Sequence, residues 1–312
     1  MTTTTQIKLP DKKAEAPKKP FRMTPAIASL LGGSEERPIG LLQLQMARAD
    51  QLGRAQHYKV KSVKDTKAKL HALEMEGYVQ VNDISTDFNR SPYVYLLTKK
   101  GVNFLREAGL DVSHAYRPDK DADNQATFII HTLAVNNVIV SAAYLNKVDP
   151  RYCLEQVIHE RTFKRKPYNV TWRGETIILI PDSYLIVHCH SSSHAPYAHI
   201  ILEHENSEKG QVPFRRKIRA YIELLKNKYA DNNKGVTVAY TTTRGPHYLN
   251  KMCRWTWEEL SSTNEPPELG HLFLFTSFDK PTPDNPIDPE KLWLEPVWYS
   301  PYNEPPTTIL GG

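Results

Sequence analysis

The chain has 312 residues, and its 40 Lys and Arg against 35 Asp and Glu leave a formal net charge of +5. This length exceeds the roughly 100–200 residues of a usual domain, so we expect two domains, each burying its own core. The basic balance favours an anionic partner. Three cysteines without a CxxC pair exclude a disulfide framework and predict a reduced, cytoplasmic protein. The first residues lack the apolar core of a signal peptide, and no run approaches about 20 apolar residues, so we expect no membrane partner.

Residues 1–37 are rich in Thr, Lys, Pro and Ala and poor in bulky apolar side chains. Such a composition buries too little surface to offset the entropy lost on ordering, so we expect a flexible basic tail. Its lysines suit a phosphate-binding arm, although a merely solvated tail has the same composition.

Residues 38–112 show the periodicity of a compact domain. The stretch IGLLQLQMARADQLGRAQ predicts helix with a break near residues 50–53, and Ser62 is a suitable cap for a second helix. Two short strands then flank a polar tip over residues 83–92, and Thr98 begins a further helix.

This order of elements resembles a winged helix-turn-helix, and KLHALEMEGYV followed by YLLTKKGVNFL is typical of that fold. A recognition helix carrying lysines presents phosphate and base-edge contacts together in a major groove, so we expect double-stranded DNA as a partner. A charged run can also be a solvated face, and winged helices also serve as protein-binding modules. The expected DNA-binding residues are Lys59, Lys61, Lys64, Lys67, Lys69 and, in the polar tip, Arg90.

Residues 113–123 form a polar linker, after which 124–277 predict a second domain. A long helix over 124–148 comes first, with His131 expected as a core or interface histidine. Strands over 175–190 and 195–206, an amphipathic helix over 213–230, and two further buried strands separated by a helix follow. The expected fold class is therefore α+β and α/β, with a central mixed sheet in the second domain. Residues 278–312 form a Pro-rich tail whose Trp293, Leu294, Val297 and Trp298 are expected to pack back.

Carboxylates near the strand ends form the candidate catalytic site. Asp182 is placed at a bend in its strand, and Glu203 and Glu205, two apart, are expected on one face of the next strand. Glu160 is a fourth candidate. Mg²⁺ accepts a few carboxylate oxygens and keeps several waters, so Asp182, Glu203 and Glu205 are the expected ligands of Mg²⁺ or Mn²⁺.

Pro181-Asp182 and Glu203 resemble the PD-(D/E)xK nuclease core, in which a Pro-Asp on one strand precedes a Glu-x-Lys on the next. Position 205 carries Glu where that pattern has Lys. Lys217 lies on the flank of the following helix with Tyr221, four residues away, and can replace the missing lysine. The plain structural alternative stays open, because Pro-Asp is a common turn and Glu-x-Glu a common strand end.

The motifs HTLAVNNVIV, HERTFK, IPDSYLIV, ILEHENSEKG and RRKIRAYIELL, preceded by a winged helix, resemble the replication-relaxation family of plasmids and other mobile elements. The resemblance implies a role in plasmid replication or DNA relaxation, with metal-dependent nicking as the expected chemistry. Its acidic Glu203-His204-Glu205 takes the place of an acidic Glu-x-Asp pattern in that family. The alternative is a non-catalytic accessory factor or repressor, with replication or mobilisation proteins as partners or a homodimer.

The histidines around the second strand raise the question of zinc. His188 and His190 share one face of the strand, and His194, His199 and His204 are near in sequence. Cys189 points to the opposite face, and no Cys/His spacing matches a tetrahedral site. The sequence therefore does not predict a zinc site.

Overall fold

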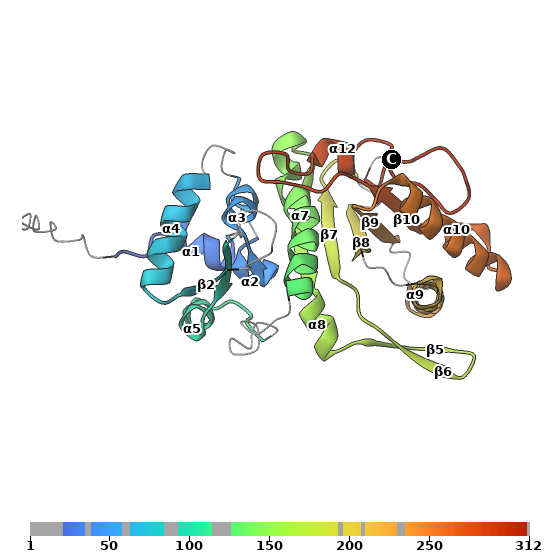
Figure 1. The fold of residues 1–312 in the computed structure, drawn as a ribbon, viewed down its shortest axis with the longest axis horizontal. Coiled ribbons are helices and arrows are strands. Elements are labelled where there is room, and N and C mark those ends of the chain that lie inside the picture. Colours follow the sequence, from blue (N-terminus) through green and yellow to red (C-terminus); the bar gives the residue numbers. More distant parts are fainter. Residues whose placement is uncertain are drawn as a thin grey trace, which may run out of the picture.

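The computed structural model describes residues 21–34, 39–57, 63–83, 93–113, 126–192, 196–206, 210–229 and 235–310 and shows an α+β protein. Within these residues, the N-terminal part (Figure 1) combines helices α1 to α5 with a three-stranded antiparallel sheet in the order β1-β3-β2. The helices are α1 (Pro25–Gly32), α2 (Leu41–Leu44), α3 (Ala49–Ala55), α4 (Val63–Met75) and α5 (Lys99–Glu107), and the strands are β1 (Met46–Ala47), β2 (Val79–Asp83) and β3 (Tyr93–Leu97).

The expected flexible tail over 1–37 is wrong for residues 25–32, whereas residues 1–20 and 35–37 lie outside the described residues. Residues 25–32 form α1, because the Thr24 side chain caps the helix and Pro25 occupies its first position. Leu30 and Leu31 of this helix are fully buried. Two adjacent leucines are enough to anchor one short helix in a segment whose average composition is polar.

The helix break also lies earlier than predicted. It falls over 45–48 rather than near 50–53, since Gln45 has a φ of 62° and Met46–Ala47 pair with β3. A two-residue strand leaves no periodicity that could reveal it. The helix opened by Thr98 is confirmed, and the Thr98 hydroxyl accepts from the N–H of Gly101 at 3.1 Å.

The rest of the chain is built on a five-stranded mixed sheet in the order β10-β9-β8-β7-β4. Strands β8, β9 and β10 run parallel, and β7 runs antiparallel to both of its neighbours. The predicted central mixed sheet is therefore confirmed. Its strands are β4 (Tyr152–His159), β7 (Ser183–Cys189), β8 (Tyr197–His204), β9 (Val236–Thr242) and β10 (Phe273–Ser277).

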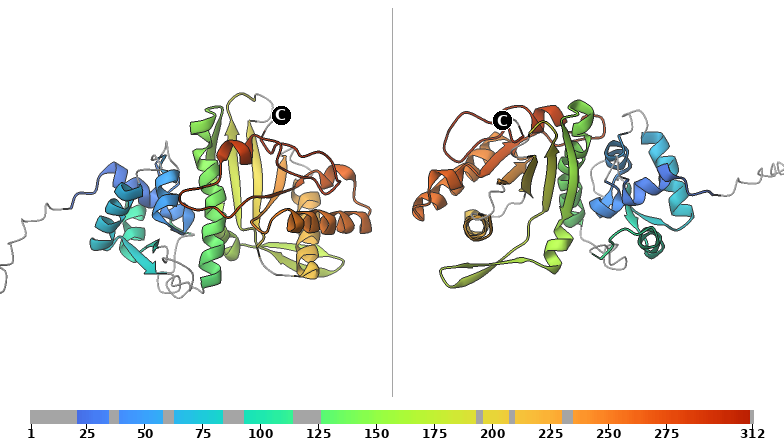
Figure 2. Two further views of the ribbon diagram at one scale, coloured as in Figure 1. Left: turned by 45° about the horizontal axis from the view of Figure 1, so that its top comes forward. Right: turned by 180° about the vertical axis from the view of Figure 1, so that it is seen from behind.

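Helices cover both faces of this sheet (Figure 2). Leu185, Val187 and Ile200 face α7, whereas Ile201 and Tyr240 face α9 and α10. Alternate residues of each strand thus pack into the two cores on opposite faces of the sheet. The covering helices are α7 (Ala126–Val148), α9 (Gln211–Leu224), its π-helical continuation η2 (Leu225–Tyr229) and α10 (Pro246–Ser262), with short helices α8 (Glu160–Arg165), α11 (Pro267–Gly270) and α12 (Pro289–Trp293).

The expected single strand over 175–190 is wrong. It is two strands, β6 (Glu175–Leu179) and β7, which are separated by Ile180–Asp182 and pair with different partners. Strand β6 pairs with β5 (Tyr168–Trp172) in a separate two-stranded ribbon that projects from the sheet (Figure 1). Asp182 therefore lies just before β7, where the chain enters the central sheet.

Helix α7 joins the two parts of the chain, which corrects the expectation of separate cores. One cluster of buried side chains continues from the N-terminal helices through α7 to the sheet. Gln51 donates to the carbonyl of Leu133 at 2.8 Å, and Asn136 donates to the carbonyls of Leu44 and Met46 at 3.0 and 2.6 Å. The segment 113–123 thus connects parts that share a core.

The composition of α7 also corrects the expectation that no run is long and apolar enough to cross a bilayer. Within the described residues, Ala126–Val148 passes that test by length and hydropathy. However, 67% of its most apolar window is buried inside the protein. A helix buried to this extent is a core helix, and its apolar residues pack against the layers on both sides of it.

The C-terminal segment packs back onto the protein as predicted. Trp293 and Trp298 are fully buried, and their indole N–H groups donate to Ser141 Oγ at 3.0 Å and to the Leu292 carbonyl at 2.6 Å. Leu294 and Val297 pack against the same cluster. These residues therefore form part of the layer that covers the α7 side of the sheet, whereas Tyr302 of the same segment packs against the cluster on the opposite face.

Candidate functional site

Asp182 sits at the junction of three elements. Its backbone carbonyl accepts from the N–H of Glu160 at 3.1 Å, which holds it beside the start of α8. Its carboxylate accepts from the backbone N–H of His204 at 2.8 Å, and Nε2 of His131 lies 3.1 Å from the other oxygen. The side chain is buried, so its charge depends on these partners.

Glu203 lies at the end of the neighbouring strand and faces helix α9. Lys217 and Tyr221, four residues apart on that helix, both contact its carboxylate. The sequence placed these two residues on one helix flank, and the structure brings both to Glu203. Glu203 itself is only 3% exposed, so these contacts replace most of its hydration.

Burial opposes ionisation of both carboxylates, but their neighbours shift the two pKa values in opposite directions. For Asp182, burial opposes ionisation, but the hydrogen bond and charge of His131 outweigh it and hold the pKa well below its usual range. Burial, with the nearby Asp182 charge, raises the pKa of Glu203 to about 8. Burial alone would lower the pKa of Lys217, yet the Glu203 and Asp182 carboxylates raise it. The pKa values of the two carboxylates are thus shifted in opposite directions, and that of Lys217 is raised.

His131 and His204 are members of the site that the sequence did not assign to it. Burial would lower the pKa of His131, but its hydrogen bond to Asp182 raises it. Burial and the His131 charge lower the pKa of His204 to about 4. The two rings lie 6.2 Å apart, and His204 Nδ1 is 2.9 Å from Thr241 Oγ1. His131 was expected in the core because it stands alone on an apolar helix, and only the tertiary fold brings Asp182 to it.

Glu205 and Glu160 are less closely engaged. Strand β8 ends at His204, so the alternation that would align Glu205 with Glu203 stops one residue short. The carboxylate of Glu205 is near enough to raise the pKa of Lys217, but it is only half-buried. Glu160 pairs with Lys164 at 2.8 Å, and its charge also raises the pKa of His131.

The oxygen donors of the site are of the type that a hard divalent cation takes, but within the described residues Asp182, Glu203 and Glu205 do not bring three ligand atoms within 4.8 Å of one another. Asp182 and Glu203 offer carboxylate oxygens at the ends of adjacent strands, and Glu205 is the next residue but one. Both buried carboxylates already contact a protein cation, His131 or Lys217. A metal ion would compete with these contacts, because it supplies the same positive charge.

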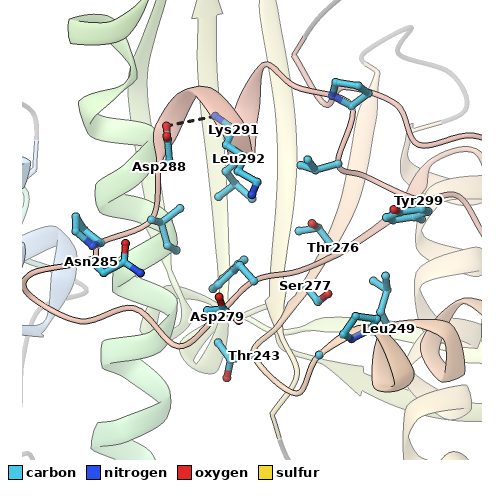
Figure 3. A pocket seen from close by; sticks show the side chains of 17 residues that line it. Thr243, Leu249, Thr276, Ser277, Asp279, Asn285, Asp288, Lys291, Leu292 and Tyr299 are labelled. Carbon is cyan, nitrogen blue, oxygen red and sulfur yellow. Dashed lines mark hydrogen bonds between the residues drawn. The ribbon is translucent and has the colours of Figure 1, made fainter.

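A cavity of about 600 Å³ lies at the same edge of the sheet (Figure 3). Thr243, Ser277 and Leu249 line it together with Lys291 of the C-terminal segment. Phe278 also lines it and stacks on His204 with ring centroids 6.3 Å apart. None of the candidate carboxylates lines this cavity, so it adjoins the carboxylate site without containing it.

The candidate DNA-binding lysines divide into two groups. Lys64 and Lys67 are exposed on α4, whose Thr66, Leu70 and Leu73 are buried. Lys69 is half-buried on the same helix. The α4 lysines therefore leave the apolar side of the helix free to pack. Three of the predicted residues fall outside the described part of the chain, namely Lys59, Lys61 and Arg90.

Comparison with known proteins gives one family. The sequence model of the family described as replication-relaxation matches residues 41–239. The match runs from α2 to β9, so it includes α4, α7 and every candidate carboxylate. Neither the curated proteins nor the solved structures contain a match.

Proposed function

Since the chain belongs to the replication-relaxation family, we propose that it binds duplex DNA and nicks it with a divalent cation held by Asp182 and Glu203. The family implies a role in the replication or relaxation of plasmid or mobile-element DNA, and hence a DNA-associated protein. Cutting one strand suits relaxation, because a single nick releases superhelical strain.

DNA binding rests on the N-terminal helices. Helix α4 turns Lys64 and Lys67 to solvent and packs on the core through Leu70 and Leu73. A helix with one buried and one cationic side can lie along a groove and contact phosphates on both sides. In this proposal α4 is the recognition helix of a winged helix-turn-helix.

The carboxylate site supplies the chemistry. A bound Mg²⁺ or Mn²⁺ would polarise the scissile phosphate and lower the pKa of the attacking water. Asp182 and Glu203 hold the cation, with Glu205 as a third ligand and Glu160 in a supporting position. His131 keeps Asp182 ionised, and Lys217 offsets negative charge that develops on the phosphate.

One observation supports this proposal above the others. Three separate segments supply Asp182, Glu203 and Lys217: Lys217 contacts the buried Glu203 carboxylate, and the buried Asp182 is close enough for its charge to raise the pKa values of Glu203 and Lys217. Buried charges are costly and contribute weakly to stability, so a buried cluster of this kind favours a functional site.

The test is conversion of a supercoiled plasmid by the purified protein with Mg²⁺, Mn²⁺ or EDTA. We expect metal-dependent open-circular product that Asp182→Asn and Glu203→Gln both abolish, while both variants keep wild-type DNA affinity in EDTA. A matched control is Glu175→Gln, which removes a carboxylate from the exposed ribbon strand β6. Equal nicking by wild type and Asp182→Asn would contradict the assignment.

A second candidate function is favoured by the enclosure of Glu203. Lys217 and Tyr221 both contact the Glu203 carboxylate, and burial raises the pKa of Glu203 to about 8. Without a metal ion, these two side chains therefore occupy the space beside the carboxylate. A non-catalytic accessory factor or repressor would have a domain of this fold whose carboxylates bind no metal, and it would act by binding DNA and partner proteins. This candidate predicts DNA binding without nicking, and no effect of Asp182→Asn on either.

A further inference from the structure

A second cluster of side chains lies at the far end of β7 from Asp182. Cys153 of β4 is the cross-strand partner of His188 on β7, and His190 follows just after the strand. The Cys153 thiol and one ring nitrogen from each histidine lie within 4.8 Å of one another. In sequence these histidines flank Cys189, and the strand register that brings Cys153 to them is invisible in sequence spacing.

The backbone holds these three residues in place. Besides the ladder between β4 and β7, the N–H of His190 donates to the carbonyl of Arg151 at 2.8 Å. The His188 ring stacks on Tyr197 with centroids 4.8 Å apart, and the His188 and His190 rings lie 4.2 Å apart. The donors are therefore gathered by the fold, and the turn that carries His190 is tied to the start of β4.

A thiolate with two imidazoles is a donor set for Zn²⁺ and similar soft or borderline cations, whereas Mg²⁺ prefers oxygen. From zinc bond lengths, tetrahedral ligands should lie about 3.4–3.6 Å apart. The three separations are at most 4.8 Å, so a contraction of roughly 1 Å by side-chain rotation would bring the donors to these distances. His190 is exposed, whereas Cys153 and His188 are partly buried, so a fourth position would face solvent.

We propose that Cys153, His188 and His190 bind one zinc-class cation, with water at the fourth position. Binding transfers the proton of the Cys153 thiol to solvent, and both imidazoles coordinate in their neutral form. Because β4 is the edge strand of the sheet, the bound ion would clamp this edge to β7 and to the turn after it. The chain would then be more stable with the ion than without it.

This site is separate from the carboxylate site. Asp182 precedes β7 and His188 lies near its end, so about 20 Å of extended strand separates them. The donor types also differ, which makes the two sites distinguishable by the metal used. The proposal therefore stands whether or not the protein nicks DNA.

The experiment is anaerobic titration of the reduced, metal-stripped full chain with Co²⁺, followed by displacement with Zn²⁺. A cobalt–thiolate charge-transfer band reports on cysteine ligation alone, so ions bound by carboxylates stay silent. We expect the band to saturate at one equivalent, to disappear on addition of Zn²⁺ and to persist in excess Mg²⁺. Zn²⁺ should also raise the Tm.

Variants assign the ligands. Cys153→Ser should abolish the band, and His190→Ala should weaken cobalt affinity at least tenfold. His190 is exposed, so its variant tests the site without disturbing the core. Cys189→Ser and Cys253→Ser are matched thiol controls and should leave the band unchanged. Absence of the band in the wild type, its survival in Cys153→Ser, or its loss in Cys189→Ser would overturn the proposal.

Discussion

At the scale of single residues, the raised pKa of Glu203 predicts how stability depends on pH. Burial raises the pKa of Glu203 from its ordinary 4.5 to about 8, so the folded state binds more protons than the unfolded state between these values. The Glu203 contribution to stability should therefore fall as pH rises from 4.5 to 8, by at most about 1.4 kcal/mol per pH unit, whereas the lowered pKa of His204 offsets this fall below pH 6.5. Urea unfolding across this window measures it. Glu203→Gln should flatten the dependence, and an unchanged slope in that variant would show that Glu203 ionises normally.

Lys217 gives a second prediction at the same scale. Its ammonium contacts Glu203 from α9, whereas the adjacent Arg216 points to Glu175 on the exposed ribbon. If Lys217 offsets charge on the reacting phosphate, Lys217→Met should reduce Mn²⁺-dependent nicking by about 10²–10³-fold, as loss of a transition-state donor does. Arg216→Met is the matched control, with wild-type rates expected. Nicking by Lys217→Met at the wild-type rate would remove Lys217 from the mechanism.

At the scale of elements, helix α4 predicts the salt dependence of DNA binding. Each lysine that contacts a phosphate contributes about 0.9 to the slope of log Kobs against log salt concentration. The triple variant Lys64→Ala, Lys67→Ala and Lys69→Ala should lower that slope by about 3. An equal change of charge far from α4, made by replacing Lys251, Lys280 and Lys291, should leave it nearly unchanged. The same slope in both triple variants would refute α4 as the DNA-contacting helix.

The elements also show what the sequence could and could not predict. Helix α5 was predicted because Thr98 caps it locally, and α9 because its apolar stripe has helical spacing. The division of residues 175–190 was not predictable, because the apolar run continues through Ile180 while the strand pairing changes partner there. Lys217 could be found from the helix period. His131 and Cys153 could not, because their partners come from segments distant in sequence.

At the scale of the whole molecule, the shared core predicts a single unfolding transition. Leu70 is fully buried in α4, and Leu70→Ala should cost about 2–5 kcal/mol. All five tryptophans lie in the second half of the chain, from Trp172 onward. Their fluorescence should therefore report the α4 variant, with a urea midpoint that falls together with far-UV circular dichroism. His71→Ala, at an exposed neighbouring position, should change little. A fluorescence midpoint unmoved by Leu70→Ala would mean that the two parts unfold separately.

Helix α7 carries contacts to both halves within about one and a half turns. His131 contacts Asp182, and Asn136 donates to the carbonyls of Leu44 and Met46. Because helix α7 contacts both the N-terminal helices and Asp182, binding of DNA and binding of Mn²⁺ belong to one thermodynamic cycle. If DNA on the N-terminal helices changes the affinity of Asp182 for Mn²⁺ by some factor, then Mn²⁺ must change the affinity for DNA by that same factor. The affinity for DNA and the affinity for Mn²⁺ would then be linked by a single coupling free energy, which can be measured by titrating either ligand in the presence of the other.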